Sequence, residues 1–76
     1  MNCEIWTKDN CPFCVKAKRL LLNRGAFIKE MKIGDNCTRE DLLAKVPSAR
    51  SVPQIFIDGE LIGGYKELEW YFETKE

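Results

Sequence analysis

Apolar and polar residues alternate at the start of the chain with the period of two that is typical of a β-strand. This alternation runs over residues 2–7 and predicts a first strand. Residues 12–24 are rich in good helix formers and predict a helix. Pro12 suits its first position, where a missing N–H has no cost, and Gly25 suits its C-terminal cap.

The pattern then predicts a second strand over residues 27–33, whose imperfect alternation favours a strand covered on both faces. A strand, a helix and a strand with such short connections predict a right-handed parallel crossover. Thr38 and Asp41 have the spacing of a capping box, which predicts a second helix that ends at Pro47.

A hairpin is predicted where Asp58-Gly59 separates two strand-like runs, residues 52–57 and 60–63. A final helix is predicted over residues 65–73. The expected fold is therefore α/β with the element order β-α-β-α-β-β-α.

Size and charge narrow the function classes. The 76 residues predict a single domain, 1–76, and the 12 basic and 12 acidic residues cancel. Without a basic excess, neither a nucleic-acid surface nor a membrane surface is expected. No apolar run reaches about 20 residues and no secretory signal is apparent, so a cytoplasmic location is expected. Cytosolic thiols stay reduced, which favours catalytic or metal-binding cysteines over structural disulfides.

The candidate chemistry lies in Cys11-Pro12-Phe13-Cys14, at the start of the first predicted helix. Unpaired backbone N–H groups and the helix dipole favour a thiolate at Cys11, and Lys8 can reach the same space. Cys14 follows one helical turn later and is expected to be less exposed. Cys11 would attack a substrate disulfide, and Cys14 would then attack the mixed disulfide and release the product.

Two other roles for this pair are disfavoured. A closed zinc site needs four ligands, but the chain has no histidine and no second close cysteine pair. No metal is therefore expected. A structural disulfide across so short a loop would remove little entropy from the unfolded chain.

Two further positions have both a functional and a structural interpretation. Pro53, if its peptide bond is cis, would expose the backbone of Val52 to a substrate that adds as a strand; otherwise it simply starts a strand. Gly63-Gly64 could form a second anion-binding site before the last helix, or it could only end the preceding strand.

Taken together, these segments resemble the glutaredoxins, of the small thioredoxin-fold dithiol type. The resemblance rests on Thr7-Lys8 leading to Cys11-Pro12-Phe13-Cys14, on Ser51-Val52-Pro53-Gln54-Ile55-Phe56-Ile57-Asp58-Gly59, and on Ile62-Gly63-Gly64-Tyr65. It implies a four-stranded mixed sheet flanked by three helices, a cis proline at Pro53, and glutathione as the reducing cosubstrate.

The resemblance also implies roles for single residues. Cys11 would be the nucleophile and Cys14 the resolving cysteine. Lys8 would bind the glycine carboxylate of glutathione, the backbone of Val52 would pair with its cysteinyl part, and Gly64 with Tyr65 would hold the γ-glutamyl end. The full set implied around glutathione is Lys8, Pro12, Phe13, Ser51, Val52, Pro53, Gly64, Tyr65 and Lys66.

Lys66 departs from the family pattern, which usually has an aspartate there for the γ-glutamyl ammonium. A lysine repels that ammonium, although Glu67 could partly compensate. The hypothesis is a weakened or reshaped glutathione site. Ser51, in place of the usual threonine, is a minor change.

The remaining cysteines and aromatic residues are expected to be structural. Cys3 aligns with an apolar strand position and should lie in the core, whereas Cys37 is expected in an exposed loop. Trp6, Phe56 and Phe72 are expected to pack in the interior.

The predicted function is a glutathione-dependent thiol–disulfide oxidoreductase, a monomer that reduces protein disulfides and glutathione mixed disulfides. Ribonucleotide reductase is one candidate acceptor. An alternative is a similar electron donor reduced by thioredoxin reductase, which Lys66 favours. A carrier of a 2Fe–2S cluster is a further alternative, against which the stiffening effect of Pro12 argues. The last alternative is a binding module whose cysteines take no part in chemistry.

Overall fold

A computed structural model describes residues 1–74 of the chain. The elements in this part of the chain are β1 (Asn2–Thr7), α1 (Pro12–Asn23), β2 (Phe27–Lys32), α2 (Arg39–Lys45), β3 (Gln54–Ile57), β4 (Glu60–Gly63) and α3 (Tyr65–Thr74). Their order is the predicted one. The last two residues of the predicted domain, 75 and 76, lie outside the described residues.

The four strands form one mixed sheet in the order β2-β1-β3-β4. Strand β1 pairs with β2 in parallel, and the pairs β1–β3 and β3–β4 are antiparallel. The parallel pair is connected through α1, as the predicted crossover requires. The structure thus confirms the four-stranded mixed sheet with three helices.

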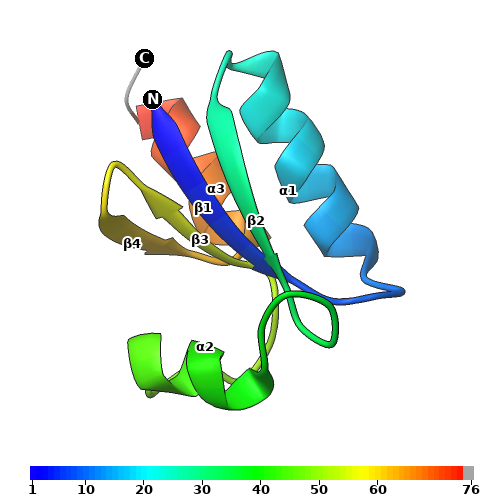
Figure 1. Ribbon diagram of the computed structural model, residues 1–76. Coiled ribbons are helices and arrows are strands. Elements are labelled where there is room, and N and C mark those ends of the chain that lie inside the picture. Colours follow the sequence, from blue (N-terminus) through cyan, green and yellow to red (C-terminus); the bar gives the residue numbers. More distant parts are fainter. Residues whose placement is uncertain (75–76) are drawn as a thin grey trace.

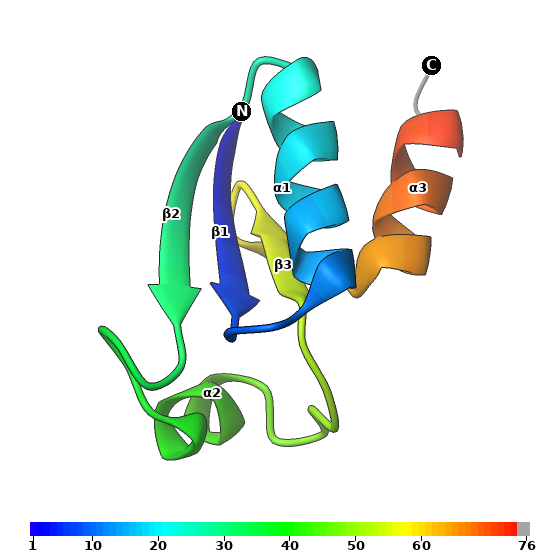
Figure 2. The ribbon, with the colours of Figure 1, turned by 90° about the vertical axis from the view of Figure 1, so that its right-hand side faces the viewer.

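The helices α1 and α3 lie side by side on one face of the sheet, whereas α2 lies at the end where β1 and β2 finish (Figures 1 and 2). None of the helices that the structure describes is long and apolar enough to cross a membrane. This arrangement leaves the N-terminus of α1 close to the end of β1, separated from it by a four-residue loop.

Two clusters of buried side chains form the core, one on each face of the sheet. The first lies under α1 and α3 and is built around Ile5, Leu21, Ile55 and Leu68, with Cys3 and Phe72 among its members. The second lies under α2 and contains Trp6, Cys37, Leu42, Val46 and Phe56. The core positions expected for Cys3, Trp6, Phe56 and Phe72 are therefore confirmed.

The N-terminus of α2 and the C-terminus of α1 are capped as the sequence predicts. The side chain of Thr38 accepts a hydrogen bond from the N–H of Asp41 at 3.1 Å, and the Asp41 carboxylate accepts one from the N–H of Thr38 at 2.9 Å. The capping box is thus complete. Gly25 follows α1 with a φ of +76°, a conformation that suits glycine at a helix C-terminus.

Strand β2 is an edge strand, and its side chains pack on both faces of the sheet, Ile28 against the first core cluster and Met31 against the second, although Phe27 at its start is 75% exposed. Two details of the prediction were wrong. Cys37 is buried, because a bridge between Ile33 and residue 37 turns the loop inward against the second core cluster. Strand β3 begins at Gln54, which leaves Val52 and Pro53 in the preceding loop.

Candidate active site

The start of α1 holds the two cysteines as a disulfide, with their Cα atoms 5.2 Å apart. Cys11 is the N-cap residue, and the backbone N–H of Cys14 donates a hydrogen bond of 3.2 Å to the Cys11 sulfur. Pro12 is the first helical residue, as predicted. Cys11 is partly exposed and Cys14 is only 2% exposed. An N–H directed at the sulfur and the helix dipole both favour the Cys11 thiolate, so the accessible cysteine is also the activated one.

The loop before β3 brings a second segment against this sulfur. The Val52–Pro53 peptide bond is cis, as the resemblance implies, and Pro53 is buried while Val52 is partly exposed. The Cys11 sulfur lies 3.8 Å from the carbonyl oxygen of Val52, across 41 positions of sequence. In the disulfide this sulfur carries no proton, so it only contacts the Val52 oxygen and donates no hydrogen bond. In the reduced protein the thiol can donate a weak hydrogen bond there.

A small cavity of about 140 Å³ lies on one side of Val52. We call it the basic pocket, because each charged residue that lines it is a cation. Its lining comprises Lys8, Ile33, Arg39, Leu42, Leu43, Ala49, Arg50, Ser51 and Val52. Lys8, Ser51 and Val52 were predicted site residues. Arg39 and Arg50 were missed, since nothing in their local sequence distinguishes them from ordinary surface cations.

The N-terminus of α3 lies on the other side of the cis-proline loop. A Cβ atom added to Gly64 would lie 3.6 Å from the carbonyl oxygen of Pro53, which shows how closely the two segments approach. The backbone N–H of Gly64 donates a hydrogen bond of 2.8 Å to the carboxylate of Glu67. Glu67, rather than Lys66, is thus the side chain at this N–H, and both residues are exposed.

Phe13 and Tyr65 connect the dithiol to α3. Their ring centroids are 5.8 Å apart, and the ring of Phe13 is 52% exposed. Burial and, to a smaller extent, the nearby carboxylate of Glu69 raise the pKa of the Tyr65 hydroxyl. The two rings give the surface beside Cys11 an apolar patch, as the resemblance implies for Phe13.

Behind the disulfide, a hollow of about 490 Å³ separates the first turns of α1 from β2. We call it the rear hollow. Its lining comprises Thr7, Lys8, Asp9, Asn10, Cys11, Pro12, Cys14, Val15, Lys18, Glu30 and Lys32. Lys8 therefore lines both the rear hollow and the basic pocket, whereas Lys66 lines neither.

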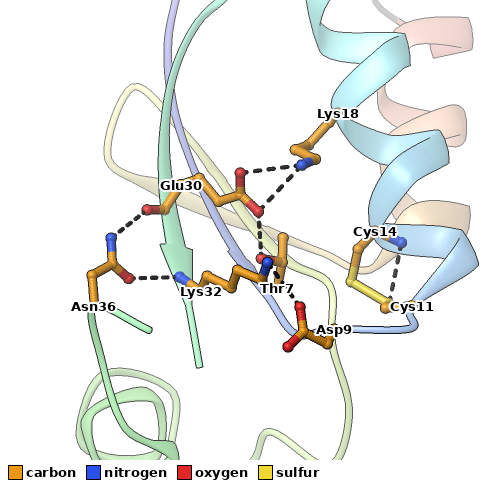
Figure 3. A network of polar contacts seen from close by, with 8 residues as sticks. All are labelled: Thr7, Asp9, Cys11, Cys14, Lys18, Glu30, Lys32 and Asn36. Atoms are coloured by element: carbon orange, nitrogen blue, oxygen red, sulfur yellow. Dashed lines mark hydrogen bonds and ion pairs between the residues drawn. A yellow bond between two sulfur atoms is a disulfide. The ribbon is translucent and has the colours of Figure 1, made fainter. Parts of the chain in front are cut away.

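Polar contacts fix the carboxylate of Glu30 in the rear hollow (Figure 3). The hydroxyl of buried Thr7 donates to it at 2.6 Å, and the Lys18 ammonium lies 3.1 Å and 3.3 Å from its two oxygens. The Thr7 hydrogen bond lowers the pKa of the Glu30 carboxyl; burial opposes this and Lys18 reinforces it. Lys32 and Asp9 form a separate ion pair of 2.8 Å at the rim. No sequence pattern distinguishes Lys18 or Glu30 from other charged residues of the chain.

These features support one reaction. A partly exposed, helix-capping sulfur can attack a disulfide, and a buried sulfur one turn away can displace the resulting mixed disulfide. Among the described residues, no group of three or more His, Cys, Asp or Glu side chains could hold a metal ion. The fold and the site together define a thiol–disulfide oxidoreductase.

Comparisons with known proteins identify the family. The family model described as Glutaredoxin matches residues 3–62. Glutaredoxin 3 of Escherichia coli K12 is 42% identical over 67 residues, which cover 88% of this chain and 81% of that protein. The chain belongs to the glutaredoxin family.

Solved structures agree with this assignment. Glutaredoxin 1 from Francisella tularensis, complexed with cacodylate, superposes with a TM-score of 0.82 at 31% identity and covers 97% of this chain and 94% of that one. A buckwheat glutaredoxin–glutathione complex has a TM-score of 0.76 at 26% identity and covers 96% and 70%. The four-stranded mixed sheet with its three helices is accordingly the thioredoxin-like fold that the resemblance implied.

Proposed function

We propose that this protein is a glutathione-dependent disulfide oxidoreductase that reduces protein disulfides and glutathione mixed disulfides. One observation carries the proposal: the Cys11 sulfur lies 3.8 Å from the carbonyl oxygen of Val52. Val52 belongs to the cis-proline loop, which lines the basic pocket and also lies close to the N-terminus of α3. A peptide thiol joined to Cys11 would therefore lie along Val52, with an anion-binding surface at one end and a helix N-terminus at the other.

Glutathione has the charges that this surface suits. Its glycine carboxylate would enter the basic pocket, where Lys8 was predicted to bind it and where Arg39 and Arg50 add two further cations. Its cysteinyl backbone would pair with Val52, and its γ-glutamyl end would lie near Gly64 and Tyr65. The structural neighbour from buckwheat, which is solved as a complex with glutathione, supports this choice of ligand.

The proposed cycle conserves electrons and protons. The Cys11 thiolate attacks a substrate disulfide, forms a mixed disulfide and expels one substrate thiolate, which takes a proton from solvent. The Cys14 thiolate then attacks the Cys11 sulfur and expels the second substrate thiolate. One glutathione thiolate opens the Cys11–Cys14 disulfide at Cys11, and a second releases glutathione disulfide. This activity suits the cytosol, where thiols are kept reduced.

A coupled reduction assay tests the proposal. One arm contains glutathione, glutathione reductase and NADPH, and the other contains thioredoxin reductase and NADPH; each is supplied with a small mixed disulfide and a protein disulfide. We expect turnover in the glutathione arm that Cys11→Ser abolishes. Cys14→Ser should keep turnover of the mixed disulfide and lose turnover of the protein disulfide. Turnover in the thioredoxin reductase arm alone would overturn glutathione dependence.

A further inference from the structure

Cys14 must lose its proton before it can attack the mixed disulfide on Cys11, because the thiolate is the nucleophile. The Cys14 side chain is only 2% exposed, and burial opposes the formation of a thiolate. The backbone N–H of Cys14 is directed at the Cys11 sulfur and not at its own. The charged groups around Cys14 therefore decide how readily it ionises.

The rear hollow supplies two such groups. Lys18 follows Cys14 by four residues on α1, so the two side chains leave the same face of the helix. Both line the rear hollow together with Glu30, which approaches from β2 (Figure 3). Both carboxylate oxygens of Glu30 contact the Lys18 ammonium, and Thr7 fixes one of them. The pair is thus held in a defined position, and each partner is only about one-third exposed.

We propose that the Lys18–Glu30 ion pair, oriented by Thr7, controls the ionisation of Cys14 in the resolving step. The Lys18 ammonium favours the Cys14 thiolate, while the Glu30 carboxylate anchors that ammonium and partly offsets its charge. Both act as positioning residues, because neither forms a bond in the reaction. In this step the Cys14 proton passes to solvent, the Cys11–Cys14 bond forms, and the bond from Cys11 to the substrate sulfur breaks.

Other titratable groups face the dithiol from the elements packed around it. Lys8 and Asp9 on the loop before α1 and Lys32 on β2 line the rear hollow, and Tyr65 on α3, which has Glu69 beside it, contacts the ring of Phe13. Lys32 and Asp9 pair with each other at the rim, where their side chains are 39% and 78% exposed and solvent screens them more strongly. These groups are unchanged in the variants below and contribute equally to each measurement.

The two phases of reaction with dithiobis(nitrobenzoic acid) separate the two cysteines. Attack by Cys11 releases a first coloured thiolate, and attack by Cys14 on the resulting mixed disulfide releases a second. Reduced protein is mixed with an equimolar amount of this reagent across a pH series, and Cys11→Ser gives the background from the buried thiols. The pH midpoint of the second phase reports the ionisation of Cys14. Glutathione is absent, so the result is independent of whether the protein uses glutathione.

We expect Lys18→Met to move this midpoint up by about one pH unit, because it removes a cation and leaves Glu30 unpaired. Glu30→Gln should move it down, because its amide oxygen can still accept from Lys18 and Thr7 while the negative charge is lost. The double variant should return towards the original midpoint. Arg19→Met, which removes a cation from the exposed side of α1, is the matched control and should leave the midpoint unchanged.

A structural role for the pair would give a different result. The proposal would be overturned if the pH midpoint of the second phase shifted in the same direction in Lys18→Met and Glu30→Gln, or shifted in neither. An equal shift in Arg19→Met would also overturn it. Lys18→Arg keeps the charge and should keep the original midpoint. Because Glu30→Gln preserves the shape of the side chain, it tests the proposal even if Lys18→Met does not fold, which circular dichroism would show.

Discussion

The carboxylate of Glu67 accepts a hydrogen bond of 2.8 Å from the backbone N–H of Gly64 at the start of α3. An acidic side chain of the protein thus already satisfies an N–H at the helix N-terminus where the γ-glutamyl end of glutathione is proposed to lie. Lys66, the residue that departs from the family pattern, is adjacent in sequence and exposed. The charges at these two positions should therefore set how well this end of the ligand binds.

Lys66→Asp should lower the KM for glutathione by about two- to five-fold, as expected for one partly exposed ion pair gained with the γ-glutamyl ammonium. The coupled assay with glutathione reductase measures this value. Lys29→Asp makes the same charge reversal on β2, away from the dithiol, and is the matched control. An unchanged or higher KM in Lys66→Asp would show that the lysine does not weaken the site.

Arg39→Ala should raise the KM for glutathione by about two- to five-fold with little change in kcat, because it removes one cation from the basic pocket. The ethyl ester of glutathione at its glycine carboxylate makes the test specific. The ester should already bind weakly, and Arg39→Ala should then add little further loss. Equal losses for glutathione and for its ester would place the glycine carboxylate elsewhere.

Glu4 lies on the sheet face opposite α1, and its carboxyl group makes the stability of the fold depend on pH. Burial favours protonation of its carboxyl, but hydrogen bonds from Lys45 and Trp6, both at 2.7 Å, outweigh burial and lower its pKa. A carboxyl whose pKa is lower in the folded state stabilises the fold above its unfolded pKa, and this contribution is lost as the pH falls through the folded pKa.

Glu4→Gln should therefore lower the free energy of unfolding by about 1.5 to 2 kcal/mol at neutral pH, the lower part of the range for hydrogen bonds to a charged group. The difference from the original protein should shrink as the pH falls below about 4, near the ordinary pKa of a glutamate. Urea denaturation of the dithiol form at several pH values measures it. Glu60→Gln, at an exposed position of β4, should show no such difference. A loss that is constant with pH would contradict the assignment.

Cys3 and Cys37 should be protected thiols in the native protein. Their side chains are 4% and 8% exposed, and burial raises the pKa of each thiol. In the Cys11→Ser/Cys14→Ser variant, alkylation by iodoacetamide should be slow in buffer and complete in urea. Alkylation of Cys37 in buffer at the rate seen in urea would show that Cys37 is exposed, as the sequence predicted.

The sequence predicted the order of the elements because each helix and strand has its own periodicity and its own caps. The Thr38–Asp41 capping box and Pro12 at the start of α1 are local signals of this kind. Exposure of Cys37 was predicted wrongly, since the burial of a loop residue depends on what the loop packs against. The edge position of β2 likewise follows from strand order, which no local pattern contains.

The candidate site likewise contains residues that the sequence could predict and residues that only the tertiary structure brings together. Cys11, Cys14 and Pro53 stand in short motifs, so their chemistry could be inferred before their positions were known. Arg39 reaches the basic pocket only through the packing of α2, and the contact between Lys18 and Glu30 joins a helix to a strand. Cations and carboxylates of this kind are common on any surface, and only the tertiary structure shows which of them lie beside the dithiol.

Attack of Cys11 on a glutathione disulfide is tested by the reaction of the reduced Cys14→Ser variant with glutathione disulfide, followed by intact-protein mass spectrometry and peptide mapping. We expect a stable adduct of one glutathionyl group on Cys11, because the thiol that resolves this mixed disulfide is missing. The original protein, treated in the same way, should instead form the Cys11–Cys14 disulfide without accumulating an adduct. Absence of an adduct on Cys11, or its formation on Cys3 or Cys37, would show that Cys11 is not the nucleophile that reacts with glutathione disulfide.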